Sequence, residues 1–323
     1  MPPRDTPIYP DDAPPAAAGD DAPPRVEDAP AAPASAEETA RQAAPCLDPP
    51  PAGMACVPGG YFLRGVEEDP HNCDQASQPA RGNVGTTPEQ RIWLDTFYID
   101  TTEVTNAAYS ACVAARDCPK DGPRYADFSA PQQPITGVSW YSANTFCRAQ
   151  GKHLQREAEF EKAARGPNGE MNPWGNEPAT CEHAIIMDDS GRSCGRTKKG
   201  SYPNNGRVME VASRPAGRYG IHDLVGNAEE WVWDYWSEDW ASCGDACTQD
   251  NPQGPCDGVE PCENHRYRVV RGGSWYWPAS HANGYHRRAY RPNNEPPHHF
   301  GFRCAASPEE AEALLNAQPS SAR

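Results

Sequence analysis

The chain has 323 residues, 37% of them hydrophobic, which is enough for one large domain or two small ones with a hydrophobic core. Its formal net charge of -16 argues against nonspecific nucleic-acid binding, because phosphate contacts require clustered Lys and Arg side chains. Nine Trp and 13 Tyr outnumber seven Phe and five Met, so we expect amphipathic aromatic side chains to fill much of the core.

The first part of the chain, residues 1–53, is dominated by Pro, Ala, Asp and Glu and has almost no aromatic residues. Such a segment cannot bury enough apolar area to fold, so we predict a disordered acidic linker. Residues Met1–Asp21 contain neither a basic region nor an apolar stretch, so no signal peptide is visible there. The sequence also predicts no transmembrane segment.

A folded domain is predicted over residues 54–307. Its first half is predicted to contain two strands and three helices: Cys56–Gly65, Arg91–Asp100, 106–115, 140–150 and Glu157–Arg165. Thr105 or Asn106 can cap the first helix, and Ser139 can cap the second, which ends where Gly151 permits a left-handed conformation.

The second half of the domain has weaker signals. Residues 168–264 are rich in Gly, Pro, Asn and Asp and show little periodicity, so long ordered loops are expected. Strands resume at Tyr267–Arg271 and Phe302–Ala305, and residues 308–323 form a short tail with a weakly helical run at Glu309–Ala317. Two to three helices flanking small antiparallel sheets, with most residues in loops, make an α+β fold.

The chain contains 13 Cys residues, far more than ordinary intracellular proteins. Eight of them lie close together as four pairs that suggest local disulfide loops: Cys112 with Cys118, Cys181 with Cys194, Cys243 with Cys247, and Cys256 with Cys262. Disulfides predict an oxidising compartment, extracytoplasmic or at the cell envelope; the alternative is that the cysteines stay reduced in a cytoplasm. Zinc is a weaker interpretation, because no Cys-x-x-Cys pair occurs.

Several short stretches, in this order, carry a family resemblance: Pro58–Phe62, Phe97–Asp100 with Thr102–Asn106, Pro134–Trp140, Gly226–Trp231, and Arg271–Trp275 with Gly301–Ala305. From about Met54 to Ser307 the chain resembles the formylglycine-generating-enzyme, or sulfatase-modifying-factor, family. The resemblance implies a loop-rich variant of the C-type-lectin-like fold. It also implies a disulfide between Cys147 and Cys304.

The resemblance also bears on catalysis. In the oxidases of the family, two cysteines after the Gly-Gly-Ser segment bind copper and use oxygen to convert a substrate cysteine into formylglycine, and soft thiolates suit Cu(I). Those two positions fall on Trp277 and Ala282, which cannot bind copper, so we do not expect the oxidase activity. Ser274 matches a pocket residue of the family, and Glu229 and His281 replace aromatic residues, which makes these three the candidates for an altered groove.

A calcium site of the family has better support in the sequence. Asp223, the backbone carbonyls of Gly226 and Ala228, and the carboxylate of Glu230 match its ligands. Hard oxygen ligands at this spacing suit Ca²⁺, so we expect a structural calcium ion. The alternative is that the two carboxylates only cap turns.

Two further groups of residues have open interpretations. One comprises His281, His286, His298 and His299 with Arg287, Arg288 and Arg291, which can hold a metal, receive an anionic ligand or acidic peptide, or pair with carboxylates of the protein itself. The other comprises Trp231, Trp233, Tyr235, Trp236 and Trp240 with Trp275, Tyr276 and Trp277, which suits either a carbohydrate or peptide platform or the core. Arg303 is expected to make an internal ion pair.

These observations leave two functional hypotheses. The first is a noncatalytic, calcium-stabilised binding or structural module of the cell envelope, with a protein, peptide or carbohydrate ligand. The second is an oxidoreductase of the same family that modifies a protein or peptide with a non-cysteine active site. Hydrolase and kinase motifs are absent from the sequence.

Overall fold

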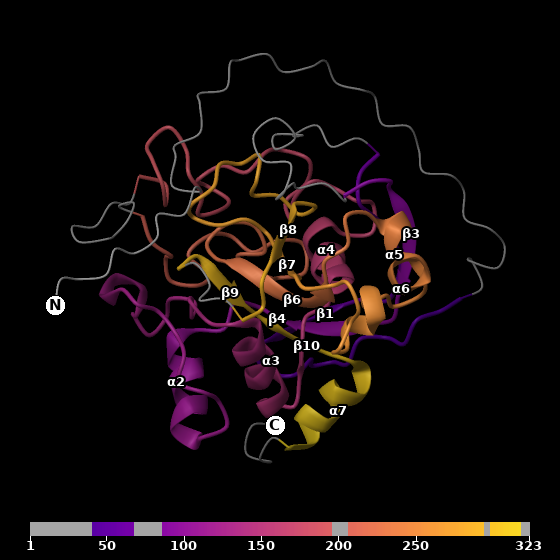
Figure 1. Cartoon of the computed structure of the whole chain (residues 1–323), viewed down its shortest axis with the longest axis horizontal. Coiled ribbons are helices and arrows are strands. Elements are labelled where there is room, and N and C mark those ends of the chain that lie inside the picture. The colour runs from indigo at the N-terminus through magenta and orange to yellow at the C-terminus, as the bar shows by residue number, and fades with distance from the viewer. Residues whose placement is uncertain (1–40, 68–85, 196–205, 294–297, 318–323) are drawn as a thin grey trace. The chain divides into compact units, whose positions relative to one another are not determined.

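The structure of the chain is a computed structural model that describes residues 41–67, 86–195, 206–293 and 298–317. These residues belong to one unit that begins at Arg41. Three small sheets with helices around them confirm the α+β prediction (Figure 1). Most of the predicted linker, residues 1–40, lies outside the described residues.

The first sheet joins the beginning of the domain to its end. Its strands, in the order β1-β4-β10-β5, are β1 (Met54–Val57), β4 (Phe97–Asp100), β10 (Cys304–Ala306) and β5 (His153–Leu154). All pairs are antiparallel, and Ile99 of β4 lies opposite both Ala55 and Ala305. Helix α7 (Pro308–Ala317) packs on this sheet through the buried Ala311, so the segment predicted as a tail begins with a docked helix (Figure 1).

The other two sheets hold the remaining strands. β2 (Gly60–Arg64) pairs with β3 (Gln90–Leu94), and the third sheet has the order β8-β7-β6-β9, with β8 (Arg287–Tyr290), β7 (Arg268–Arg271), β6 (Glu229–Tyr235) and β9 (Phe300–Phe302). The pairs are antiparallel except for β6 and β9, which run parallel. This one parallel pair departs from the predicted antiparallel sheets.

The three helices predicted in the first half of the domain are present: α2 (Asn106–Ala115), α3 (Trp140–Ala149) and α4 (Glu157–Arg165). Thr105 caps α2 by accepting a hydrogen bond from the backbone of Ala108 (3.2 Å), and Ser139 caps α3 in the same way. Besides α7, the single-turn helices α5 (Trp240–Cys243) and α6 (Asp245–Thr248) and the 3₁₀ turns η2 (Ala126–Phe128) and η3 (Pro255–Gly258) raise the helix count above the predicted two to three. Turns this short carry no apolar periodicity in the sequence.

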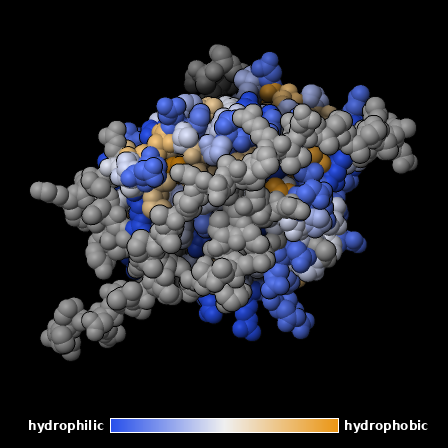
Figure 2. All heavy atoms as spheres, turned by 90° about the horizontal axis from the view of Figure 1, so that it is seen from above, coloured by the Kyte–Doolittle hydropathy of each residue, from blue (hydrophilic) through white to orange (hydrophobic). Residues whose placement is uncertain are grey.

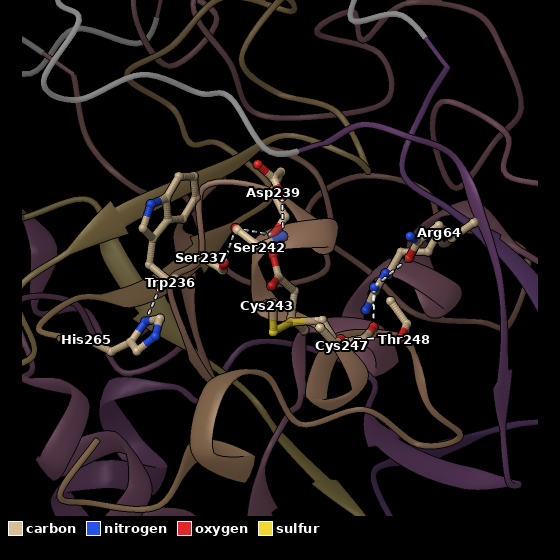
Figure 3. The surroundings of a disulfide bond; sticks show 12 residues. Arg64, Trp236, Ser237, Asp239, Ser242, Cys243, Cys247, Thr248 and His265 are labelled. Atoms are coloured by element: carbon tan, nitrogen blue, oxygen red, sulfur yellow. Dashed lines mark hydrogen bonds between the residues drawn. A yellow bond between two sulfur atoms is a disulfide. The ribbon is translucent and has the colours of Figure 1, made fainter. Parts of the chain in front are cut away.

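Six disulfides close the described structure: Cys46–Cys56, Cys112–Cys118, Cys147–Cys304, Cys181–Cys194, Cys243–Cys247 and Cys256–Cys262. Five of them join the partners expected from the sequence. The bond that links α5 to α6 lies beside Arg64, which donates a hydrogen bond to the carbonyl of Cys247 (Figure 3). Such a number of disulfides indicates an oxidising environment.

The disulfide that the sequence did not predict moves the domain boundary. Cys46–Cys56 fastens residues 41–53 to β1, and the backbone of Leu47 donates to the hydroxyl of Tyr98 (2.7 Å). These residues were assigned to the linker because Pro and Ala dominate their composition. The ordered domain therefore starts near Arg41 rather than at residue 54.

The large aromatic side chains mostly fill the core. Trp231 and Trp240 are almost fully buried, and the indole N–H groups of Trp231 and Trp140 donate to backbone carbonyls at 3.0 and 2.8 Å. Arg268 lies between the rings of Trp140 and Tyr235, at 3.7 and 3.5 Å from their centroids. The interpretation of this aromatic run as core therefore holds for these side chains.

The helices of the described part of the chain are short. In the described residues, no helix combines the length and hydropathy that crossing a bilayer requires. On the face drawn in Figure 2, hydrophobic side chains form small patches among hydrophilic ones.

Candidate functional site

Glu229, one of the three predicted groove residues, is the first residue of β6 and is fully buried. Its backbone N–H donates to the carbonyl of His299 (2.8 Å), because the parallel strands pair Glu229 with Phe300. Its carboxylate accepts a hydrogen bond from Arg288 Nη1 of β8 at 3.1 Å and lies 3.8 Å from His299 Nε2. The third sheet thus brings an acid, a guanidinium and an imidazole together.

A tight turn after β7 positions the aromatic residues of the site. The backbone N–H of Trp277 donates to the carbonyl of Ser274 (3.1 Å) and closes the turn. Gly273 has a φ of +65°, and a Cβ atom there would come within 2.4 Å of the His281 carbonyl. Only glycine permits this approach, so the Gly-Gly-Ser motif has a structural reason to be present whether or not copper is bound nearby.

We call the resulting group of side chains the Glu229 cluster: Glu229, Arg192, Trp275, Tyr276, Trp277, His281, Arg288 and His299. Its rings lie in mutual contact. Tyr276 stacks on His299 and Trp277 stacks on His281, each with ring centroids 5.3 Å apart. The guanidinium of Arg288 lies over the ring of Trp277 at 4.8 Å. Cationic, acidic and aromatic groups therefore share one small volume.

Several polar atoms of the cluster have no hydrogen-bond partner within the described ranges. They are Nε1 of Trp275, Nε1 of Trp277 and both ring nitrogens of His299, all of them buried. Trp277 approaches Glu229 closely enough to act on its pKa, although its Nε1 does not reach hydrogen-bond geometry. Buried polar atoms are paired almost everywhere in proteins, so four unpaired ones in one place mark this region as a candidate site.

The protonation states follow from burial and neighbouring charge. Burial, together with the positive charges of His298, Arg288 and Arg192, holds the pKa of His299 well below its usual range, so the ring is neutral at pH 7. Burial raises the pKa of Glu229, although Arg288 opposes the shift. Perturbed titratable groups of this kind are frequent at functional sites.

The other two predicted groove residues differ in their relation to Glu229. His281 is near enough that its charge acts on the Glu229 carboxyl, so these two come together. Ser274 is fully buried in the turn, where its hydroxyl accepts a long hydrogen bond from the backbone of Tyr276 (3.4 Å). Sequence reasoning did not single out Arg192, which has no motif around it, and it placed His299 only within a loose histidine group.

The two positions that the sequence resemblance assigns to the copper ligands of the oxidases hold Trp277 and Ala282. Trp277 stacks on His281, and Ala282 is fully buried among Ala179, Ile186 and other apolar residues. In the described ranges, no three His, Cys, Asp or Glu side chains gather as a metal site.

The arginines near the end of the domain do not converge on one ligand. Arg287 is buried and forms an ion pair with Glu157 of α4 (2.8 Å), whereas Arg288 faces Glu229. Arg291 lies over the ring of Tyr267 at 5.9 Å. For Arg287 and Arg288, the alternative of pairing with carboxylates of the protein itself is therefore the one observed.

The predicted calcium ligand Glu230 has its carboxylate occupied by other groups. Arg303 donates to both of its oxygens, with distances of 2.6 to 3.0 Å, and Gln155 Nε2 donates at 2.7 Å. The internal ion pair expected for Arg303 is thus present. With no open oxygen and a guanidinium beside it, Glu230 does not fit a direct role in holding a cation.

Asp223 fits a cation better, with Glu103 as its companion. Asp223 accepts a hydrogen bond from the backbone of Ala212 at 2.7 Å. Glu103 is 1% exposed; its Oε1 accepts from Asn227 Nδ2 (2.9 Å), while Oε2 has no hydrogen-bond partner among the described residues. Burial raises the pKa of both carboxyls, and the charge of Asp223 raises that of Glu103 further. Two neighbouring buried carboxylates supply oxygen donors of the kind that a hard divalent cation binds, although such an ion needs further oxygens besides these.

Comparison with known proteins finds a matching family model and similar proteins. The family model of the sulfatase-modifying factor enzyme 1-like domain matches residues 40–308. The formylglycine-generating enzyme of Thermomonospora curvata is 30% identical over 311 residues, covering 79% of this chain and 94% of the relative.

Two solved structures share the fold. PvdO from Pseudomonas aeruginosa has 24% identity and a TM-score of 0.57, covering 78% of this chain and 93% of PvdO. Treponema denticola variable protein 1 has 19% identity and a TM-score of 0.57, covering 79% and 95%. At these identities the likeness concerns the fold alone, a C-type-lectin-like variant as predicted.

Proposed function

The chain belongs to the sulfatase-modifying factor enzyme 1-like family, and on that premise we propose that it is an extracytoplasmic ligand-binding domain without copper-dependent formylglycine oxidase activity. One observation carries the proposal. Six disulfides engage twelve of the 13 cysteines, and the remaining one, Cys73, lies outside the described residues. Because the oxidase chemistry implied by the family needs two thiolates, one thiol is too few.

The ligand-binding role is supported by the Glu229 cluster. A domain that only stabilised an assembly would gain nothing from buried indole and imidazole nitrogens without partners, because each such group costs stability. A protein or peptide ligand is the class we favour, and a carbohydrate is the alternative. The disulfides support a location outside the cytoplasm, at the cell envelope or beyond.

The test compares the chain with an authentic oxidase. The purified full chain and the formylglycine-generating enzyme of Thermomonospora curvata are each loaded with Cu(I) and incubated with a cysteine-containing peptide in oxygen. Mass spectrometry should detect aldehyde only with the enzyme from Thermomonospora curvata, and thiol counting should find at most one free thiol in this chain. Copper-dependent turnover by this chain would overturn the proposal.

A double substitution provides the matched control. Trp277→Cys with Ala282→Cys restores sulfur at the two positions, so this variant should retain Cu(I) after desalting whereas the parent chain should not. If both retain copper equally, the metal binds elsewhere and the correspondence of these positions is wrong.

The second candidate is an oxidoreductase of the same family with a non-cysteine active site. It is favoured by the proximity of Glu229, whose pKa is raised by burial, to His299, whose pKa is lowered by burial, because the two side chains lie close enough for a proton to pass between them. An oxidation would in addition need an electron acceptor such as oxygen. If Glu229→Gln, Ser274→Ala and His281→Ala leave every oxidation of a peptide substrate unchanged, this candidate fails.

Calcium belongs to the proposal as a stabilising ion. Asp223 and Glu103, with the carbonyls of Gly226 and Ala228, would hold it, and the ion would screen two carboxylates that otherwise repel each other. Glu230 would not contact the ion and would act only through its ion pair with Arg303.

A further inference from the structure

The polar edges of the Glu229 cluster are mainly hydrogen-bond donors. An indole Nε1 can only donate, so the buried nitrogens of Trp275 and Trp277 both require an acceptor. The neutral ring of His299 adds one more donor and one acceptor. A ligand that satisfies these atoms must therefore present several acceptor oxygens within a small volume.

The ring faces of the cluster are already occupied, which limits the ligand further. Tyr276 is contacted by the guanidinium of Arg192, 3.6 Å from its centroid, and by the stacked ring of His299. Trp277 is contacted by His281 and Arg288 in the same manner. A stacked imidazole and a guanidinium on each of these two rings disfavour stacking of a flat sugar or aromatic ring on them, and a cationic ligand would meet two guanidinium groups.

The charges near the buried nitrogens favour an anion. Arg192 and Arg288 contribute two positive charges, Glu229 contributes one negative charge, and His299 is neutral. The two guanidinium groups lie in a chain with a formal net charge of -16. Charge-assisted hydrogen bonds from guanidinium and N–H groups are the common means of holding carboxylates in proteins.

We propose that the Glu229 cluster is a binding site for a compact carboxylate, carried by an acidic side chain of a peptide. This inference rests on the proposed ligand-binding function and names its ligand class. Residues 277–281 are half-buried, so the carboxylate would enter on this side, past Trp277, and accept from its Nε1. In the free protein a water molecule would serve as the acceptor that the carboxylate oxygen replaces.

The experiment uses the full chain and two acetylated, amidated tripeptides, Gly-Glu-Gly and its neutral counterpart Gly-Gln-Gly. Calorimetry and tryptophan fluorescence should show at least about tenfold tighter binding of the glutamate peptide. Glucuronate and glucose form a second pair that distinguishes an acidic sugar from an acidic peptide. Binding of the glutamate peptide supports the proposal, whereas binding of glucuronate alone, equal binding of both tripeptides, or no binding of any probe overturns it.

Two substitutions locate the site. Trp277→Phe removes the indole N–H and keeps a ring, and Arg192→Gln removes a charge from a half-buried position; each should weaken glutamate-peptide binding about tenfold. Trp174→Phe and the exposed Arg148→Gln are the matched controls and should bind as the parent does. Unchanged binding in both site variants overturns the location.

These results remain separable from the proposed function. The copper assay tests the absence of oxidase activity without any carboxylate probe. A chain that lacks oxidase activity but binds no carboxylate would refute this ligand class and leave the ligand-binding proposal in place.

Discussion

Two groups of buried charges flank the third sheet and differ in how completely they are paired. Around α4, the carboxylates of Glu157 and Glu161 accept hydrogen bonds from Arg165, Arg271 and Arg287, with every one of these distances between 2.7 and 2.9 Å. Glu161 also accepts a hydrogen bond from the backbone N–H of Gly65, the residue after β2, at 2.6 Å. Nearly every oxygen has a donor, as buried ions require.

The Glu229 cluster also contains a buried carboxylate beside an arginine but is not closed in this way. Its carboxylate has one arginine at 3.1 Å, and the nearby nitrogens of Trp275 and His299 have no partners among the described residues. The carboxylates of both groups are almost fully buried, so burial of the acid does not separate them. Completeness of pairing does, and it suggests that the first group serves stability and the second serves a ligand.

Breaking the α4 network should have the largest effect. Glu161→Gln keeps the shape of the side chain but leaves the guanidinium groups of Arg165 and Arg271 without a full counter-charge. We expect a loss of about 3 to 5 kcal/mol in the free energy of unfolding, measured by urea denaturation with calcium present. A loss below about 1 kcal/mol would show that the network is not the stabilising element described here.

His153 sharpens the comparison, because both of its ring nitrogens have partners, whereas those of His299 have no hydrogen-bond partner in the part of the chain that the structure describes. Glu310 lies 2.7 Å from Nδ1 and Glu159 lies 3.1 Å from Nε2. Although burial alone would lower the pKa of His153, these carboxylates raise it to about 9, above its usual 6.5. The pKa of Glu159 falls to about 2 through the same contact, so the two pKa shifts describe one interaction.

The stability from His153 is fully present below about pH 6.5 and is lost as the pH rises through about 9, with a total on the order of 3 kcal/mol. Lys162 has the opposite effect over part of this pH range. Burial lowers its pKa to about 8, so its contribution to the free energy of unfolding increases as the pH rises above that value. Urea unfolding of the parent and of His153→Gln at several pH values isolates the histidine. Parallel stability curves for the two proteins would contradict the prediction.

A third contrast bears on calcium: both carboxylate oxygens of Glu230 accept hydrogen bonds, whereas Oε2 of Glu103 has no hydrogen-bond partner among the described residues. If Asp223 and Glu103 hold the ion, calcium at 100 times its dissociation constant should stabilise the parent by about 2.7 kcal/mol, measured as a shift in thermal unfolding. Glu103→Gln should abolish this shift. Asp48→Asn, an exposed control, should keep it. A calcium shift that survives in Glu103→Gln would place the ion elsewhere.

Local features of the fold could be predicted from the sequence, whereas the pairing of distant side chains could not. Thr105 and Ser139 cap helices through residues three positions away, so their signals lie within a few residues. The parallel pairing of β6 with β9 joins segments about seventy residues apart, and no local pattern encodes it. Cys46 lies in a Pro-rich stretch whose composition concealed its disulfide.

The candidate site shows the same division. Glu229, Ser274 and His281 were identified because the family resemblance fixes positions along the chain. The contact between Glu229 and His299 depends on the parallel strand, and the position of Arg192 depends on a long loop. The resemblance likewise suggested Glu230 as a calcium ligand, but could not reveal that Arg303 engages both of its oxygens.

The smallest expected effect on stability is also the most direct test of the comparison. Glu229→Gln removes a buried carboxylate whose charged hydrogen-bond donor among the described residues, Arg288, is itself 16% exposed and can be solvated. Because a buried charge with incomplete pairing costs free energy, we expect unfolding to change by less than about 1 kcal/mol, in either direction. The affinity for the glutamate peptide should change far more than the free energy of unfolding does. If urea unfolding of this variant instead shows a loss as large as that of Glu161→Gln, the cluster is a structural network, and the contrast between the two groups fails.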